Sequence, residues 1–527
     1  MQRGRPVHSA LIALLVLTAL ALYAWQLDRV PANLHDAEVQ FGLHARAIAL
    51  TGHDATGHFM PVYFYMPAIG DNVWFHPVLV YWTAPFLWVL PFSEWSVRFP
   101  TAVLGALNVW LIYVVAARLF QSRSIALLAA ATLALTPAHF LHGRVAMDYL
   151  HPVPFILAWL WCLLRFESDR KWGFVYAGAA VLGVGVYSYI ASIAMMPLYL
   201  AATLAYAWWR HDLSPRRAVA MVGCFLAPLT AAVYWFGQNP GALQQTAMRY
   251  AMGHADAGWL TRLRWYLNYN AIQDQLSIYF DFFNPAYLFL AGGTDLMNST
   301  RMAGVLLFAT APLLAVGLVQ ACRGQWNPIN LLLVFGFVTA PIAATFVRGS
   351  RATDRELGIL PFAVLLSVMG FIAMRQDSRR WVRTLAIGLV IAMPAQFAFF
   401  HSDYLGDYRI RSAGAFESNL RGAVDEMVRL APGVPRFYVS TTLPYGRDYW
   451  RFAQAKAGVE GLETLTSPLT PSSLDLSAVP PASLILGHAS DVALRDASRS
   501  GQLRLVYEAP EFGTDTVFFV YRRPGPE

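Results

Sequence analysis

Long apolar segments recur along the first three quarters of the chain, separated by short polar stretches. A helix needs about 20 apolar residues to cross the roughly 30 Å hydrocarbon core of a membrane. The first such segment, ALIALLVLTALALYAW, follows a basic N-terminus. The pattern predicts a mainly α, polytopic transmembrane helical bundle with about eleven crossings. The later crossings are expected at about 97–119, 124–141, 152–166, 172–190, 191–209, 218–236, 302–320, 328–347, 356–374 and 383–401.

One apolar segment, HPVLVYWTAPFLWVLPF at residues 76–92, does not fit this series. It is short, contains three prolines and is rich in Trp and Tyr, which is typical of a helix at the headgroup level. Counting it as a crossing would place every later arginine cluster outside. We therefore expect an interfacial helix here, which leaves the N-terminus and the arginine clusters in the cytoplasm. The ALA at residues 19–21 is compatible with signal-peptide cleavage, but the apolar run continues past it.

Four pieces then lie outside the cytoplasm: 27–96, 139–151, 237–301 and the tail from 402. The tail alternates strand-like segments, such as SLILGHA and DTVFFVYRR, with the helical segment GAFESNLRGAVDEMVRL. We expect two domains. A transmembrane domain spans 1–401, with outer loops 27–96 and 237–301, and a small extracytoplasmic α/β domain spans 402–527.

Composition supports a membrane protein over a soluble one. Of the 527 residues, 57% are hydrophobic, which is too much apolar surface for a soluble globular chain. The net charge of +7 comes from basic clusters between apolar runs, which indicates membrane topology and not a nucleic-acid surface. The three cysteines match no metal or redox spacing, so we interpret them as buried small hydrophobic residues.

The polar residues expected at the outer membrane face are candidates for chemistry, because ionisable groups at membrane depth are costly and usually functional. Asp36 and Glu38 follow the first crossing and lie two residues apart. In an extended segment they would share a face, whereas on a helix they would point to different sides. Either could accept a proton, or could instead cap the helix expected over FGLHARAIAL.

Two further segments carry arginines and carboxylates. In RVAMDYLHPVPF, Asp148 would lie one helical turn after Arg144, so the two could form a simple ion pair. In RGSRATDREL, residues 348–357, Arg351 and Arg355 could bind a phosphate or belong to a solvated turn. A mixture of carboxylates and cations suits a reaction in which a phosphate leaves and a hydroxyl or amine attacks.

Three runs carry a family resemblance: DAEV through TGHDATGHFMPVYF, then HPVLVYW, then SEWSVRFPTAVLGALNVWLIYVVAARLF. They resemble bacterial membrane glycosyltransferases of the GT-C superfamily, similar to the protein O-mannosyltransferases and lipid A aminoarabinose transferases of glycosyltransferase family 39. The resemblance covers roughly residues 1–400 and is clearest over the first 150. It implies a multi-pass protein of a bacterial inner membrane, with the C-terminal domain in the periplasm.

The resemblance also implies site residues. The family's adjacent Asp and Glu are matched by Asp36 and Glu38, with one residue between them, and an acid of this loop lies near the catalytic centre. Alignment on Gly42 makes Glu38 the second acid, and we favour Asp36 as the base. Substrate contacts are implied or expected for five residues, of which Arg144 and Arg351 come from the reasoning above: His76, Arg144, Asp148, Arg351 and Arg355.

The function implied is transfer of a sugar from a polyprenyl-phosphate donor to a lipid, glycan or protein acceptor at the periplasmic face. Members of the superfamily differ in their use of a divalent cation, so metal dependence stays open. A transporter or flippase of lipid-linked saccharides would favour charges along the middle of helices and internal repeats. An O-antigen ligase or polymerase would favour basic residues in the loop at 237–301, whereas this sequence concentrates its acids in the first outer loop.

Overall fold

The structure is a computed structural model and is mainly helical. It describes residues 5–68, 71–211, 213–242, 245, 261, 264, 267–323, 327–345, 351–417, 419–443, 445–459, 461–510 and 517–525. Most of the central part of the predicted outer loop 237–301 lies outside these residues. The described chain divides into two compact units, Met1–Trp25 with Thr56–Trp82 and Phe99–Asp403, and Gln26–Ala55 with Thr83–Arg98 and Tyr404–Glu527.

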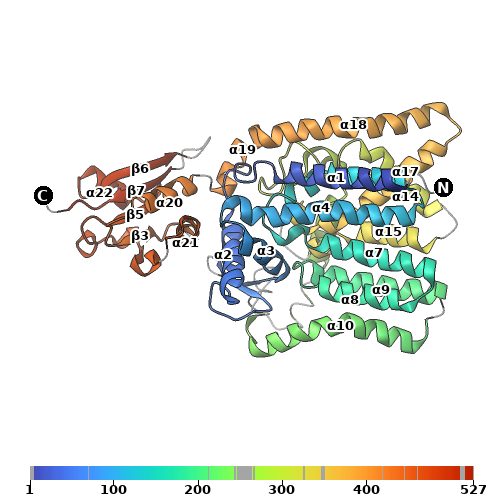
Figure 1. Cartoon of the computed structure of the whole chain (residues 1–527), viewed down its shortest axis with the longest axis horizontal. Helices are drawn as coiled ribbons and strands as arrows, with labels where there is room; N and C mark the ends of the chain where they lie inside the picture. Colours follow the sequence, from blue (N-terminus) through green and yellow to red (C-terminus); the bar gives the residue numbers. More distant parts are fainter. Residues whose placement is uncertain are drawn as a thin grey trace. The chain divides into compact units, whose positions relative to one another are not determined.

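The first unit is a bundle whose long helices run side by side (Figure 1). Six helical segments in the described residues are long and apolar enough to cross a membrane, so the chain is a multi-pass membrane protein and the count of eleven crossings stays a prediction. These segments are Glu94–Leu119, Asp148–Asp169, Pro215–Gln238, Pro328–Thr345, Leu357–Gln376 and Arg380–Leu405. The helices of the bundle are α1 Arg5–Ala24, α4 Glu94–Leu119, α5 Arg123–Ala134, α6 Pro137–His142, α7 Pro152–Asp169, α8 Trp172–Gly185, α9 Ser192–His211, α10 Pro215–Gln238, α13 Tyr269–Asp281, α14 Thr310–Arg323, α15 Pro328–Thr339, α16 Ile342–Thr345, α17 Leu360–Gln376 and α18 Arg380–Leu405.

Three predicted helices differ from those in the structure. The run at 124–141 is broken into α5 and α6, and the run at 328–347 into α15 and α16. Pro137 and Pro341 lie at these breaks, where the missing backbone N–H of proline removes a helical hydrogen bond. The run at 302–320 becomes regular helix only from Thr310.

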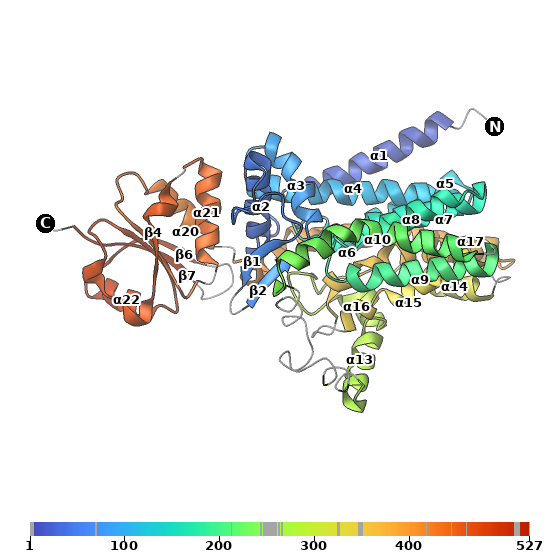
Figure 2. The same ribbon diagram turned by 90° about the horizontal axis from the view of Figure 1, so that it is seen from below.

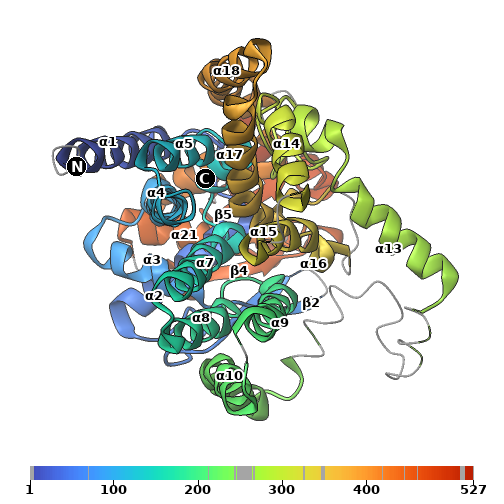
Figure 3. The ribbon, with the colours of Figure 1, turned by 90° about the vertical axis from the view of Figure 1, so that its right-hand side faces the viewer.

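The segment at 76–92 forms the short helix α3, Val78–Val89. Its 12 residues extend about 18 Å at roughly 1.5 Å per residue, which is too short to cross the hydrocarbon core. A hairpin of β1, Phe64–Ala68, and β2, Asp71–Phe75, comes just before it. Figure 2 shows α13 projecting from the side of the bundle, and Figure 3 shows α4 and α10 nearly end-on.

The second unit joins the C-terminal segment with two pieces of the first outer loop, including α2, Asp36–Thr51. Its five-stranded mixed sheet has the order β4-β3-β5-β7-β6, with β3 parallel to β4 and β5. Helix α22 packs through Leu494 against Ile485 and Tyr521 on one face, and α20 and α21 cover the other (Figure 2). The elements are α19 Asp407–Arg411, α20 Leu420–Arg429, β3 Phe437–Ser440, α21 Gly446–Ala457, β4 Thr466–Leu469, β5 Leu484–His488, α22 Val492–Arg499, β6 Arg504–Pro510 and β7 Val517–Arg522.

Candidate active site

Asp36 and Glu38 open helix α2, so the helical alternative holds and the two side chains leave the helix in different directions. His35 is the N-cap residue, and its backbone N–H donates to Glu38 Oε2 at 2.9 Å. This is half of a capping box, in which the residue at the third helical position satisfies a free N–H at the helix start. Glu38 therefore satisfies the backbone N–H of the N-cap residue.

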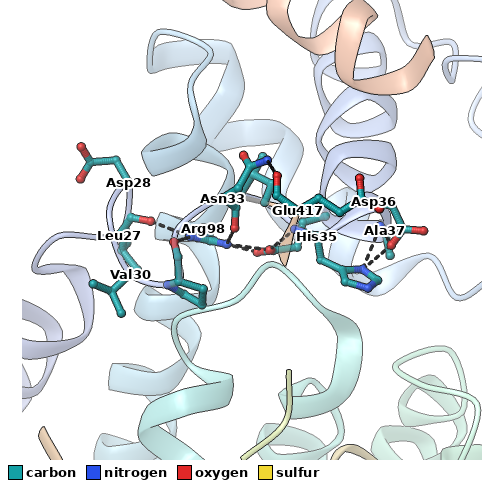
Figure 4. Close-up of polar contacts among 12 residues, drawn as sticks. Leu27, Asp28, Val30, Asn33, His35, Asp36, Ala37, Arg98 and Glu417 are labelled. Carbon is teal, nitrogen blue, oxygen red and sulfur yellow. Dashed lines mark hydrogen bonds and ion pairs between the residues drawn. The ribbon is translucent and has the colours of Figure 1, made fainter. Parts of the chain in front are cut away.

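Glu38 is also held by Arg98, and neither side chain is exposed. Arg98 Nε donates to Glu38 Oε1 at 2.9 Å, and Arg98 Nη2 donates to Glu38 Oε2 at 2.8 Å. The remaining guanidinium N–H groups bond the carbonyl oxygens of Leu27, Pro31 and Asn33 (Figure 4). A guanidinium has five N–H donors, and all five are used here. Glu38 is thus committed to a buried structural ion pair.

Asp36 has a different environment, because its side chain keeps 16% of its surface exposed. Its Oδ1 accepts from the Ala37 N–H at 2.7 Å and contacts His35 Nδ1 (Figure 4). In this contact His35 Nδ1 is the donor, because an ionised carboxylate oxygen can only accept a hydrogen bond. The same nitrogen therefore cannot also accept from the Ala37 N–H, which lies 3.3 Å away.

The charge on Asp36 is stabilised by these neighbours. Burial raises the pKa of Asp36, but hydrogen bonds from His35, Ala37 and Tyr445 outweigh burial and hold the pKa below its ordinary value. For His35, burial lowers the pKa, but the Asp36 carboxylate outweighs it and the net pKa is raised. Asp36 is therefore ionised at neutral pH and able to accept a proton.

The other five candidate residues belong to the first unit. His76 follows β2 directly, and the pairing of Phe64 with Phe75 places Tyr63 opposite it, with ring centroids 5.5 Å apart. Burial lowers the pKa of His76 to about 3. The imidazole is therefore buried and neutral at neutral pH, so it brings no positive charge to an anion.

Arg144 and Asp148 do not lie one helical turn apart as expected, because α6 ends at His142 and a separate 3-10 helix begins at Asp148. Arg144 is fully buried, and its Nη1 donates to the carbonyl oxygens of Leu22 at 3.1 Å and Tyr23 at 2.8 Å. Those carbonyls belong to the last turn of α1. Arg144 thus caps α1, since a cation is favourable at a helix C-terminus.

Asp148 and Asp354 belong to a buried acid–tyrosine cluster, which also contains Tyr189, Glu356 and Tyr287. Tyr189 donates to Asp354 Oδ2 at 3.3 Å and lies within electrostatic range of Asp148. The hydroxyl of Tyr287 donates to Glu356 Oε1. Burial raises the pKa of Asp354, and Arg355 and Tyr189 offset this only in part. Burying these acids costs free energy, and clusters of buried titratable groups are typical of functional sites.

The two late arginines each have a carboxylate neighbour. Arg351 donates through Nε to Asp281 Oδ2 at 2.9 Å and through Nη2 to Asp281 Oδ1 at 3.0 Å. Arg355 Nε lies 3.5 Å from Asp354 Oδ2. Their side chains keep 34% and 20% of their surface exposed, so both can still reach an anion. Arg348, from the same turn, lies outside the described residues.

Sequence reasoning missed Arg98 and Tyr445. A signal for Arg98 existed, since an arginine at the edge of an apolar crossing needs a buried partner. Nothing local marks Tyr445, which lies far from Asp36 in sequence. Among the described residues, no group of three or more His, Cys, Asp or Glu side chains could hold a metal ion.

Comparison with known proteins relates this architecture to sugar-transferring enzymes. Residues 75–235 match the family described as dolichyl-phosphate-mannose-protein mannosyltransferase. The structure aligns with ArnT from Cupriavidus metallidurans bound to undecaprenyl phosphate at a TM-score of 0.63 and 13% identity, covering 98% of this chain and 99% of that one. The resemblance to GT-C glycosyltransferases is confirmed.

The likeness in fold to ArnT therefore extends over nearly the whole chain, beyond the roughly 400 residues in which the sequence resemblance was seen. The apo form of the same ArnT aligns equally well, with a TM-score of 0.62, 14% identity and the same coverage of both chains. Archaeal AglB from Archaeoglobus fulgidus, solved with an inhibitory peptide and a dolichol-phosphate, reaches a TM-score of 0.50 at 12% identity, covering 88% of this chain and 65% of AglB. No curated protein sequence matches.

Proposed function

We propose that this protein is an integral-membrane glycosyltransferase that moves a sugar from a polyprenyl-phosphate donor to an acceptor at the periplasmic face. The observation that carries the proposal is the alignment of almost the full chain with ArnT bound to undecaprenyl phosphate. The family matched over residues 75–235, which is also named for a polyprenyl-phosphate sugar donor, supports the same donor class.

Asp36 is the proposed general base. In a single displacement, the acceptor hydroxyl or amine attacks the anomeric carbon and its proton passes to the Asp36 carboxylate. The bond between the anomeric carbon and the phosphate oxygen breaks, and the polyprenyl phosphate leaves with that electron pair. Asp36 suits this function because it is ionised and partly exposed, whereas Glu38 is enclosed by Arg98.

The leaving phosphate gains negative charge as the bond breaks, so positive groups must stabilise it. We assign this function to Arg351 and Arg355, the two partly exposed arginines of the late turn, with His76 as a neutral donor. Arg144 is instead assigned to holding α1, because its guanidinium bonds backbone carbonyls there.

The test is sugar transfer from a radiolabelled polyprenyl-phosphate sugar to total membrane acceptors. Asp36→Asn should lower the rate by roughly a hundredfold or more at unchanged protein abundance, since a general base contributes about 10²–10⁴-fold. Glu38→Gln should instead reduce the amount of folded protein, because it weakens a buried ion pair. Normal transfer by Asp36→Asn would rule out Asp36 as the base. A transporter would show no donor consumption by any variant.

A further inference from the structure

Helix α21 of the C-terminal segment presents one face to the first outer loop within the second unit. Residues 445, 449, 452 and 456 share this face, because their spacing of three and four residues follows the helical period. The hydroxyl of Tyr449 donates to the Leu34 carbonyl oxygen at 2.7 Å. The ring of Phe452 lies 4.6 Å from the ring of Phe92, and Lys456 Nζ lies 2.9 Å from Glu94 Oε1.

The first residue of this face, Tyr445, contacts the candidate base itself. It lies one turn before Tyr449 on the same face, and its side chain is a neighbour of Asp36 that lowers the pKa of that carboxyl, together with His35 and Ala37. One turn later, Tyr449 fixes the carbonyl of Leu34, which immediately precedes the His35–Asp36 pair. The C-terminal segment therefore holds both the carboxylate and the backbone that leads into it.

We propose that Tyr445 is a positioning residue for Asp36, so that the C-terminal α/β segment supplies part of the catalytic site. This inference rests on the proposed function, in which Asp36 is the base. A phenol that donates to one carboxylate oxygen fixes the rotamer of the carboxylate and favours its ionised form. The lone pairs that the donors leave open can then receive the acceptor's proton.

Several charged or titratable groups face Asp36 and enter any pH argument. His35 and Glu38 belong to the same helix start as Asp36, and Tyr445, Asp448 and Tyr449 belong to the start of α21. Burial raises the pKa of Asp448, and the nearby Asp36 charge adds to the rise. Removing the Tyr445 hydroxyl takes away one donor to ionised Asp36, so the pKa of Asp36 must rise. As the pH is lowered, activity that needs ionised Asp36 would then be lost at a higher pH than in the native protein.

The experiment compares Tyr445→Phe with Tyr449→Phe and Tyr438→Phe in the radiolabelled transfer assay, as full-length proteins of equal abundance. Tyr445→Phe should lower the rate at saturating donor by roughly ten- to a hundredfold, as expected for a misplaced catalytic group, with little change in donor KM. The acidic limb of its pH–rate profile, where the rate falls as the pH is lowered, should move to higher pH. Tyr449→Phe, which keeps the bond to the carboxylate, should lower the rate without moving that limb. Tyr438→Phe, on strand β3, should behave like the native protein.

An unchanged rate and acidic limb in Tyr445→Phe would overturn the inference, and so would an equal shift of the limb in Tyr449→Phe. These outcomes differ from failure of the proposed function. If Asp36→Asn transfers sugar normally, the assignment of the base is wrong. If Asp36→Asn is inactive while Tyr445→Phe is normal, only the positioning function of Tyr445 is wrong.

Discussion

Asp36 and Glu38 lie two residues apart but have different surroundings in this protein. Glu38 is fully buried in an ion pair, whereas Asp36 stays partly exposed and is surrounded by donors. The difference comes from helix geometry, because positions one and three of α2 point to different sides. One side meets Arg98, and the other meets His35 and Tyr445.

The Arg98–Glu38 pair should be the most sensitive polar contact of the second unit. Arg98→Met leaves a buried, unpaired carboxylate and three carbonyl oxygens without their donor, so it should cost about 3–5 kcal/mol of stability. The double variant Arg98→Met/Glu38→Leu removes the unpaired charge and should be more stable than Arg98→Met alone. Thermal unfolding of the purified protein in detergent measures both.

The matched control for this pair is Arg429→Gln, which breaks the exposed ion pair with Glu426. It should leave the unfolding temperature unchanged, because exposed ion pairs contribute little. If the single and double Arg98 variants are equally unstable, the unpaired charge is not the cause of the loss.

At the scale of elements, helices α14 and α17 of the first unit approach each other closely. A Cβ added at Gly317 would overlap the carbonyl oxygen of Leu366, and one added at Gly370 would overlap that of Leu313. The two glycines thus let the backbones touch in both directions, as small residues do between helices in membranes. The sequence pattern placed both helices in the bundle but did not indicate this contact.

Gly317→Ala and Gly370→Ala should each lower stability by about 1–3 kcal/mol, because the helices must move apart to accept the methyl group. Gly388→Ala, on α18, is the control. No atom lies within 4 Å of its added Cβ, and alanine is the better helix former by about 1 kcal/mol. It should be neutral or stabilising in the same thermal unfolding measurement. Equal losses in all three variants would contradict close packing as the cause.

At the scale of the whole molecule, the chain is not divided simply into a membrane part and a tail. The C-terminal sheet and its helices form one compact unit with segments of the first outer loop, including the start of α2. The acid proposed as the base is therefore supported from far along the sequence. We therefore propose that the C-terminal segment supports the catalytic site.

The expected topology can be checked with fusions in the bacterial inner membrane. Alkaline phosphatase fused to the C-terminus should be active and a green fluorescent protein fusion there should be dark, because the C-terminal segment is expected in the periplasm. A fluorescent fusion after Asp377, between α17 and α18, should be bright, since the arginines around it are expected in the cytoplasm. A bright C-terminal fusion would exclude an odd number of crossings.

The sequence by itself determined the helical membrane architecture, because spanning a hydrocarbon core requires long apolar segments, and these are visible without any contact information. It also indicated Asp36 as a candidate acid and revealed the likeness to GT-C enzymes. The prolines at 137 and 341 were visible in the sequence, but the length of the apolar runs favoured one continuous helix at each place, and the structure has two.

Tertiary structure alone decided which groups surround each acid. Arg98 and Tyr445 reach α2 from remote segments, and the burial of Glu38 and the exposure of Asp36 follow from that packing. The charge state of His76 likewise depends on the hairpin that buries it. Burial and neighbouring charge set the pKa of a group, and both are properties of the folded chain, which no local pattern of residues contains.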